Sequence, residues 1–374
     1  MKVAVMSATL ERRTGYGNIT YEYCSALHRK GVEFVLFLPR GEASLAEKLR
    51  LPFPVRCILP RYVVRYNFWN IWPYFRRIDV SQFDLVHSLL DFPFCFLAAR
   101  SAAKYGKPFL MGAQGTYGVM PLTYAPDKYL LQWAYRQAKH IIVPSRFTKE
   151  MILQHAGEKY PIEVIHNGVN FSRFDRVMDT KEIRECAKER KILLTVGNFK
   201  ERRGQDLVLR ALGQLKKKRD DFFYVLIGGG SFRSSLEALV QELDLISHVF
   251  FVGQQEGDAL VRYFQACDIY VHTPRVFRLN FEGFGIVYLE ASACGKPIVA
   301  TDAGGIRDAV LDGKTGIIVP DEDVEGVARA LDRLLSDAEL RKRLGEEGKR
   351  YAASHDWSII VDDFLKLYAD AVRT

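Results

Sequence analysis

The sequence predicts an α/β protein with two doubly wound parallel sheets. Short apolar runs alternate with stretches of helical periodicity along the chain. Such alternation is typical of parallel strands that helices cover on both faces. The strands expected in the first half are residues 3–7, 33–38, 84–87, 108–112, 140–144 and 162–166. Those expected in the second half are residues 191–196, 222–227, 249–252, 269–272, 297–301 and 316–319.

A turn signal separates the two series of strands. Asn167 and Gly168 lie between them, and 374 residues are enough for two domains. We therefore expect an N-terminal domain of residues 1–170 and a C-terminal domain of residues 171–354. In open α/β sheets, ligands bind beyond the carboxyl ends of the strands, so functional residues are expected just after each strand.

The composition is that of an ordinary globular protein, but its charge is unevenly distributed. Apolar residues make up 48% of the chain and charged residues 26%, and six cysteines lack paired spacing, which favours reduced thiols in the cytoplasm. Residues 1–170 carry 22 Lys and Arg against 12 Asp and Glu, whereas the remainder carries 31 against 33. The surplus of +8 thus lies in the first half, which is expected to meet something anionic.

The strongest pattern runs from residue 280 to residue 305. Glu282 lies in a Gly-rich loop before an apolar helix, and Glu290 follows about two helical turns later, near the same face. A helix N-terminus suits a phosphate, and a carboxylate within an apolar helix needs a polar partner such as a ribose diol. The alternative is that Glu290 faces solvent and the glycines only shape turns.

This run resembles the E-x7-E signature of the family 4 retaining glycosyltransferases, and the resemblance extends over almost the whole chain. It implies the GT-B fold, in which two Rossmann-like domains face a central cleft and the last helix, residues 355–374, returns to the N-terminal domain. It also implies that Glu282 contacts hydroxyls of the donor sugar and that Glu290 binds the ribose. The backbone amides that it places at the sugar and the diphosphate are those of Phe284, Gly285 and Ile286.

A second pattern is the basic loop 196–204, after the first strand of the second half. Cations on a short loop suit a departing diphosphate. The loop resembles the family pattern V-G-R-x4-K-G, but it has Asn198 in place of the Arg and Arg203 in place of the Lys. We expect Arg203 to be a catalytic cation, together with Lys200 or Arg202, and Asn198 to lie among the donor-binding residues.

Two sets of residues in the first half are further candidates. Gly15 and Gly17 follow the first strand and open a helix, a position that approaches a phosphate closely. The family has a similar loop against the donor diphosphate. His87 and Gln114, at the ends of later strands, are the expected acceptor-side residues. The family commonly has His where this chain has Gln114, and Gln cannot take up a proton at pH 7.

Residues 61–78 are basic and aromatic and contain no acidic residue. Such a segment suits a membrane interface, and the alternative is that it packs on its own domain. We find no metal-binding motif in the chain, and no nucleic-acid-binding motif accompanies this segment, so we expect neither a metal nor nucleic acid.

The predicted function is therefore a retaining glycosyltransferase that needs no cofactor. It moves a sugar from a nucleoside diphosphate sugar to a hydroxyl of a lipid-linked or cell-surface glycan, in the cytoplasm or on the inner face of the membrane. Two alternatives stay open. One is another enzyme of the same fold, such as an epimerase or a phosphorylase, and the other is a non-catalytic nucleotide- or carbohydrate-binding protein.

Overall fold

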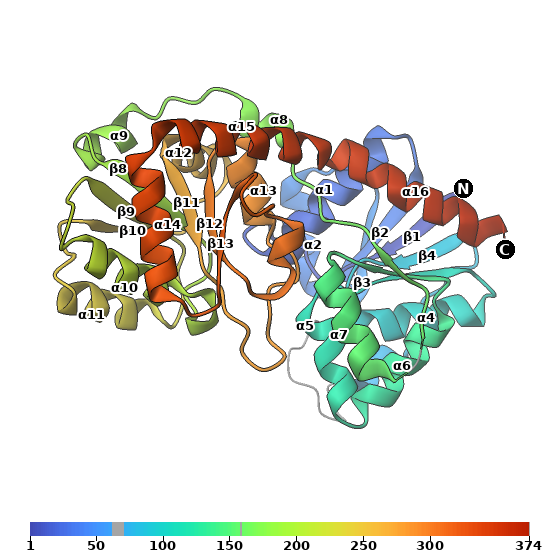
Figure 1. Ribbon diagram of the computed structural model, residues 1–374. Helices are drawn as coiled ribbons and strands as arrows, with labels where there is room; N and C mark the ends of the chain where they lie inside the picture. Colours follow the sequence, from blue (N-terminus) through green and yellow to red (C-terminus); the bar gives the residue numbers. More distant parts are fainter. Residues whose placement is uncertain (62–70, 158, 374) are drawn as a thin grey trace. The chain divides into compact units, whose positions relative to one another are not determined.

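The computed structural model describes residues 1–61, 71–157 and 159–373, and these form two α/β units (Figure 1). Unit 1 comprises Met1–Gly168 and Trp357–Thr374, and unit 2 comprises Val169–Asp356. Each unit contains one sheet in which all paired strands are parallel. The predicted α/β class with two wound sheets is therefore confirmed.

The sheet of unit 1 has seven strands in the order β3-β2-β1-β4-β5-β6-β7. Its order reverses between β1 and β4, where β1 also pairs with β2. The sequence did not predict β3, an edge strand whose side chains alternate between exposed and partly buried, so that no apolar run marks it. The strands are β1 (Lys2–Met6), β2 (Glu33–Pro39), β3 (Val55–Leu59), β4 (Leu85–Ser88), β5 (Phe109–Gly112), β6 (His140–Val143) and β7 (Ile162–Val164).

A side-chain cap fixes the start of the first helix of unit 1. Helix α1 (Gly15–Arg29) begins after Thr14, whose side-chain oxygen accepts a hydrogen bond of 3.0 Å from the N–H of Gly17. The other helices are α2 (Ala43–Leu49), α4 (Phe94–Lys104), α5 (Thr116–Val119), α6 (Asp127–Gln137), α7 (Arg146–Ala156) and α16 (Trp357–Arg373), with short 3-10 turns η1 (Arg40–Glu42), η2 (Trp72–Phe75) and η3 (Met120–Thr123).

The C-terminal helix α16 belongs to unit 1 and packs against α1 (red in Figure 1). The phenol oxygens of Tyr368 and Tyr23 lie 2.6 Å apart in the buried interface between the two helices. Trp357 is 2% exposed, and its indole fills the space that Gly168 leaves. The last helix is thus held by buried aromatic packing as well as by hydrogen bonds.

The sheet of unit 2 has six strands in the order β10-β9-β8-β11-β12-β13. Successive residues of β8 supply opposite faces: Leu193 joins one apolar cluster, and Ile192 and Leu194 join the other. Burial on both faces explains why these strands are almost continuously apolar. The strands are β8 (Lys191–Val196), β9 (Phe222–Ile227), β10 (Val249–Gly253), β11 (Ile269–His272), β12 (Ile298–Thr301) and β13 (Gly316–Val319).

Helices lie on both faces of this sheet, because the two apolar clusters take their remaining residues from different helices. The cluster that includes Leu193 is completed mainly by α10, α11 and α14, and the other mainly by α12 and α13. The helices are α8 (Phe171–Asp175), α9 (Lys181–Ala187), α10 (Gln205–Leu215), α11 (Arg233–Glu242), α12 (Gly257–Ala266), α13 (Ile286–Ala293), α14 (Val324–Ser336) and α15 (Ala338–Ser354), with 3-10 turns η4 (Glu201–Arg203) and η5 (Gly304–Asp308).

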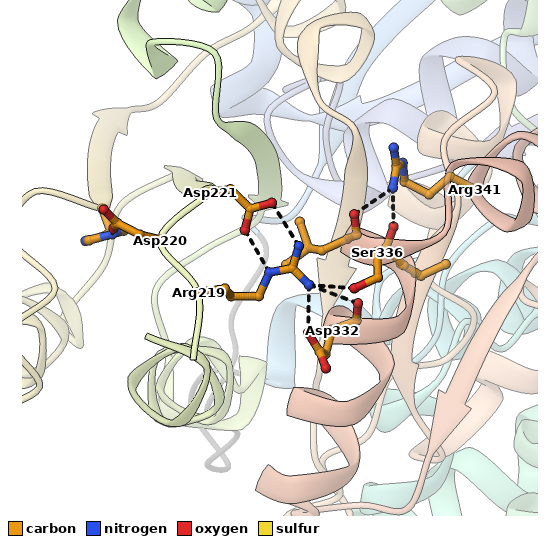
Figure 2. A network of polar contacts seen from close by, with 9 residues as sticks. Arg219, Asp220, Asp221, Asp332, Ser336 and Arg341 are labelled. Carbon is orange, nitrogen blue, oxygen red and sulfur yellow. Dashed lines mark hydrogen bonds and ion pairs between the residues drawn. The ribbon is translucent and has the colours of Figure 1, made fainter. Parts of the chain in front are cut away.

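A polar network fastens the loop before β9 to the end of α14 (Figure 2). The guanidinium of Arg219 donates to the carboxylate of Asp221 at 2.7 and 2.8 Å, and to Asp332 and Ser336 on α14 at 2.7 and 2.8 Å. Arg341 donates to the last carbonyl groups of α14, which have no partner within that helix. Because Arg219 precedes β9, the network lies at the amino end of that strand, away from the loops described next.

Candidate functional site

The strand order of unit 2 reverses between β8 and β11, which are neighbours in the sheet. Loops that leave neighbouring strands at such a reversal diverge and expose backbone groups, so ligands commonly bind there. The basic loop follows β8, and the loop with Glu282 follows β11. Two patterns that lie about 80 residues apart in the sequence therefore begin at the same edge of the sheet.

The basic loop is packed tightly against the end of β11. Gly204 has φ +70°, and a Cβ on it would lie 1.7 Å from the carbonyl oxygen of Thr273, so no other residue fits. The hydroxyl of Thr273 donates to the carbonyl oxygen of Gly204 at 2.8 Å, and the N–H of Arg275 donates to that of Arg202 at 2.9 Å. These contacts fix the position from which Arg203 extends.

Arg203 and Glu282 form an ion pair, in which a guanidinium N–H donates to the carboxylate. Their side chains are 21% and 17% exposed, so the pair is screened less by water than a surface pair. The structure thus brings together the two residues that the sequence assigned to the diphosphate and to the sugar. Each charge neutralises the other, and both side chains keep some exposed surface.

Glu282 and Glu290 are held by different elements. The carbonyl oxygen of Glu282 accepts a hydrogen bond of 2.8 Å from the N–H of Gly305, which fixes the loop before α13. Gly285 is the N-cap of α13, so the free N–H groups of the first turn begin beside Glu282. Glu290 is 7% exposed, and its charge adds to burial in raising the pKa of Tyr270. The alternative of a solvent-facing Glu290 is wrong.

His272 ends β11 among these groups, and the sequence analysis assigned it no role. It is 1% exposed, and its ring centroid lies 5.7 Å from that of Tyr288 in the first turn of α13. Burial lowers its pKa well below the usual value, and the charges of Arg203 and Arg202 add to this effect, so the ring is neutral. The signal in the sequence was a titratable residue at the carboxyl end of an otherwise apolar strand.

The other residues of the basic loop are placed less deeply. Asn198 and Lys200 are exposed, whereas Arg202 is half-buried. The carbonyl oxygen of Asn198 accepts a hydrogen bond of 3.2 Å from the side chain of Gln205. Because Arg202, together with Arg203, acts on the buried ring of His272, its charge is felt inside the site. Of the two predicted partners for Arg203, Arg202 is therefore the one that the structure favours over Lys200.

In unit 1, the glycines of the first loop have different surroundings. Gly17 lies against the backbone of Glu11, so a Cβ there would be 2.1 Å from the carbonyl oxygen. A Cβ on Gly15 would meet no atom within 4 Å in the described part of the chain. Gly17 is thus required by packing, whereas the surface of Gly15 is open to a ligand.

The prediction that His87 faces an acceptor is wrong. Its side chain is completely buried, and Nδ1 lies 2.7 Å from the phenol oxygen of Tyr368 and 3.3 Å from that of Tyr23. Burial lowers its pKa to about 3. His87 is a neutral core residue that connects β4 with α1 and α16. The sequence shows that it ends a strand, but not that the last helix covers it.

Gln114 lies just after β5 and is half-buried. Its side-chain oxygen accepts a hydrogen bond of 3.2 Å from Asn167, and its backbone N–H donates to the carboxyl group of Asp91 at 2.5 Å. Burial raises the pKa of Asp91 to about 8, although the hydrogen bond from Gln114 opposes this. Asp91 is a second residue that the sequence analysis missed. Its contact with Gln114 joins two loops that lie 23 residues apart in the sequence, so no local pattern marks it.

Half of the basic aromatic segment, residues 62–70, lies outside the described residues. In the part that is described, Trp72 is 61% exposed and stacks on Phe75, and the guanidinium of Arg100 lies 5.4 Å from the ring centroid of Phe75. Within the described ranges, no helix is long and apolar enough to cross a membrane. In the same ranges, no group of three or more His, Cys, Asp or Glu side chains is arranged to hold a metal ion.

The two wound sheets and the site at the reversal of β8 and β11 define a protein of the GT-B class. Solved structures of that fold match nearly the whole chain. The Anabaena protein HepE, solved in complex with UDP, covers 99% of this chain and 100% of its own with a TM-score of 0.82 and 17% identity. Sucrose-phosphate synthase from Thermosynechococcus elongatus covers 99% and 98% with a TM-score of 0.78 and 21% identity.

Comparison with sequence families agrees with the assignment to this fold. The model described as glycosyl transferases group 1 matches residues 179–351, and the model described as glycosyltransferase family 4 matches residues 13–173. The chain belongs to the family 4 glycosyltransferases, as its glutamate pair predicts.

Two curated relatives illustrate the range of the family. An uncharacterized glycosyltransferase of Methanocaldococcus jannaschii is 28% identical over 78% of this chain and 77% of its own length. The GDP-mannose-dependent α-(1-6)-phosphatidylinositol monomannoside mannosyltransferase of Mycolicibacterium smegmatis is 32% identical over 56% of each. The match thus spans about half the length of that second relative.

Proposed function

We propose that this glycosyltransferase transfers a hexose from a nucleoside diphosphate sugar to an acceptor hydroxyl and retains the anomeric configuration. The observation that carries the proposal is the ion pair of Arg203 and Glu282 beside the N-terminus of α13, with Glu290 buried within that helix. One carboxylate, one cation and a set of free N–H groups lie together, and they match the hydroxyls, the diphosphate oxygens and the ribose of such a donor.

The chemistry assigned to these residues is positioning and charge stabilisation. The leaving diphosphate gains negative charge as the bond to the anomeric carbon breaks, and Arg203 with the first turn of α13 stabilises that charge. Glu282 accepts hydrogen bonds from the sugar and turns its anomeric carbon toward the acceptor. The departing phosphate oxygen takes the proton of the attacking hydroxyl on the same face, so no protein carboxylate forms a covalent bond. The reaction therefore needs no metal or other cofactor.

The acceptor is proposed to be a lipid-linked or cell-surface glycan at the cytoplasmic face of a membrane. Three observations support this: the positive surplus of residues 1–170, the exposed indole of Trp72, and a relative that acts on a phosphatidylinositol monomannoside. Arginine and tryptophan side chains suit the headgroup region of a bilayer. Co-sedimentation with anionic and with neutral vesicles tests the surface, and binding to neither would contradict it.

The donor half is tested by a thermal-shift screen of UDP, GDP and ADP sugars, followed by transfer assays with the donor that stabilises the protein. Glu290→Ala is expected to weaken donor binding. Glu282→Ala is expected to reduce transfer more than it weakens binding of the nucleotide. Negligible effects of both substitutions would contradict the assignment of roles, and donor binding without transfer or hydrolysis would contradict the enzymatic function.

A further inference from the structure

His272 occupies a central position in the donor site of unit 2, although no pattern of the family marks it. It is the last residue of β11, and Thr273 beside it holds the basic loop through Gly204. Side chains alternate between the two faces of a sheet along a strand, so the rings of His272 and Tyr270 lie on the same face, against which α13 packs. The ring therefore lies on the same side of the sheet as the first turn of α13.

The ring lies close to both backbone elements that are assigned to the diphosphate. Its Cε1 atom is 3.9 Å from the position that a Cβ on Gly197 would occupy, so the turn after β8 passes directly over it. On the other side, it packs on Tyr288 in the first turn of α13, and the phenol O–H of Tyr288 donates to the carbonyl oxygen of His272 at 2.9 Å. The second contact fixes the end of the strand and hence the ring.

One polar atom of this ring is not satisfied within the protein. Nδ1 of His272 is buried and has no hydrogen-bond partner among the described residues. Buried polar atoms are almost always paired, because the loss of water costs stability that only a new hydrogen bond restores. By contrast, His248, another buried histidine of unit 2, bonds to Asp220 through Nε2 and to Ser247 through Nδ1. An unsatisfied atom at a ligand site indicates a partner that arrives with the ligand.

The charges around the ring of His272 determine which kind of ligand group it can bind. Arg202 and Arg203 oppose protonation of the ring, so it stays neutral and offers one N–H donor and one acceptor nitrogen. The same two cations favour an anion beside them. A neutral N–H adds a donor to an anion site without adding a like charge next to the guanidinium groups.

We propose that His272 is a further donor-binding residue, whose neutral imidazole donates a hydrogen bond from Nδ1 to a diphosphate oxygen of the nucleotide sugar. This inference rests on the proposed function and extends it to a residue that the glutamate pair does not identify. It also explains why a buried strand ends in a residue whose unsatisfied Nδ1 destabilises the protein when no donor is bound.

The test compares His272→Leu and His272→Asn with the wild-type protein and with the control His248→Leu. Isothermal titration calorimetry gives the affinity for UDP, GDP or ADP, whichever binds best. His272→Leu is expected to weaken diphosphate binding about ten- to a hundredfold, which corresponds to the loss of one charge-assisted hydrogen bond. His272→Asn retains a donor near the position of Nδ1 and is expected to restore most of the affinity.

Melting temperatures separate this role from a purely structural one. His272→Leu removes an unsatisfied polar atom and is expected to melt at the wild-type temperature or above, whereas His248→Leu is expected to melt lower and to bind the diphosphate normally. Diphosphate affinity that is unchanged in His272→Leu, or reduced as much in His272→Asn as in His272→Leu, would overturn the inference alone. A wild-type protein that binds no nucleoside diphosphate would overturn the proposed function together with it.

Discussion

Substitution of Glu290 by Gln is expected to weaken binding of the nucleoside diphosphate sugar about tenfold. The side chain is 7% exposed within α13, so a ribose hydrogen bond to it forms largely away from water. A hydrogen bond to a charged group contributes about 1.5–3 kcal/mol and a neutral one about 1 kcal/mol. Gln keeps the size and one accepting oxygen of Glu290, so the loss is the difference between the two, about 1.4 kcal/mol, which corresponds to about tenfold in Kd.

The assay is isothermal titration of the donor that gives the largest thermal shift. Glu290→Ala removes both accepting oxygens and is expected to weaken binding by at least about a hundredfold. Glu237→Gln is the matched control, because Glu237 is a half-exposed residue of α11 that pairs with Arg233. The affinity of this variant for the donor is expected to stay at the wild-type value. If both Glu290 variants fold like the wild type and bind the donor with unchanged Kd, the assignment of Glu290 to the ribose is refuted.

Three further predictions concern other parts of the molecule. Gly17→Ala places a methyl group against the backbone of Glu11 and is expected to cost about 1–3 kcal/mol in chemical unfolding, whereas Gly15→Ala is expected to keep the stability and to weaken donor binding. Equal stability of the two variants would contradict this. Burial raises the pKa of Asp91 from its ordinary 3.8 to about 8, so between these values the folded chain retains a proton that the unfolded chain has lost. The contribution of Asp91 to the free energy of unfolding is therefore largest below pH ~4, and it falls by about 1.4 kcal/mol per pH unit up to pH ~8. Urea unfolding measured across this range is expected to show this fall in the wild type relative to Asp91→Asn. Arg219→Ala is expected to lower the melting temperature through the loss of its ion pairs and to leave the donor Kd unchanged, and a weaker Kd would show that the network reaches the site.

The fold was largely predictable, because burial on both faces of a parallel strand imposes an apolar run that can be read directly. Every strand expected from such a run is present, and β3 was missed because its side chains alternate. The glutamate pair could also be predicted from the sequence, since Glu282 and Glu290 lie in one short segment of the chain.

The remaining site residues depend on contacts that no local pattern encodes. His87 was assigned to the acceptor because it ends a strand, but Tyr368, far along the chain, covers it. His272 ends a strand in the same way, and each histidine has one buried ring nitrogen without a bond in the described structure, but His272 lies beside the charges of Arg202 and Arg203. The two histidines look alike in the sequence, and only tertiary packing distinguishes the core residue from the site residue.

The most direct measurement is proton NMR of the reaction in progress, with the selected nucleotide sugar and a lipid-linked glycan acceptor. The proposed mechanism predicts that nucleoside diphosphate is released only with intact Arg203 and Glu282, and that the new glycosidic linkage first appears with the anomeric configuration of the donor. A product of the opposite configuration would contradict the retaining mechanism, and donor that stays intact with every acceptor would contradict transfer itself.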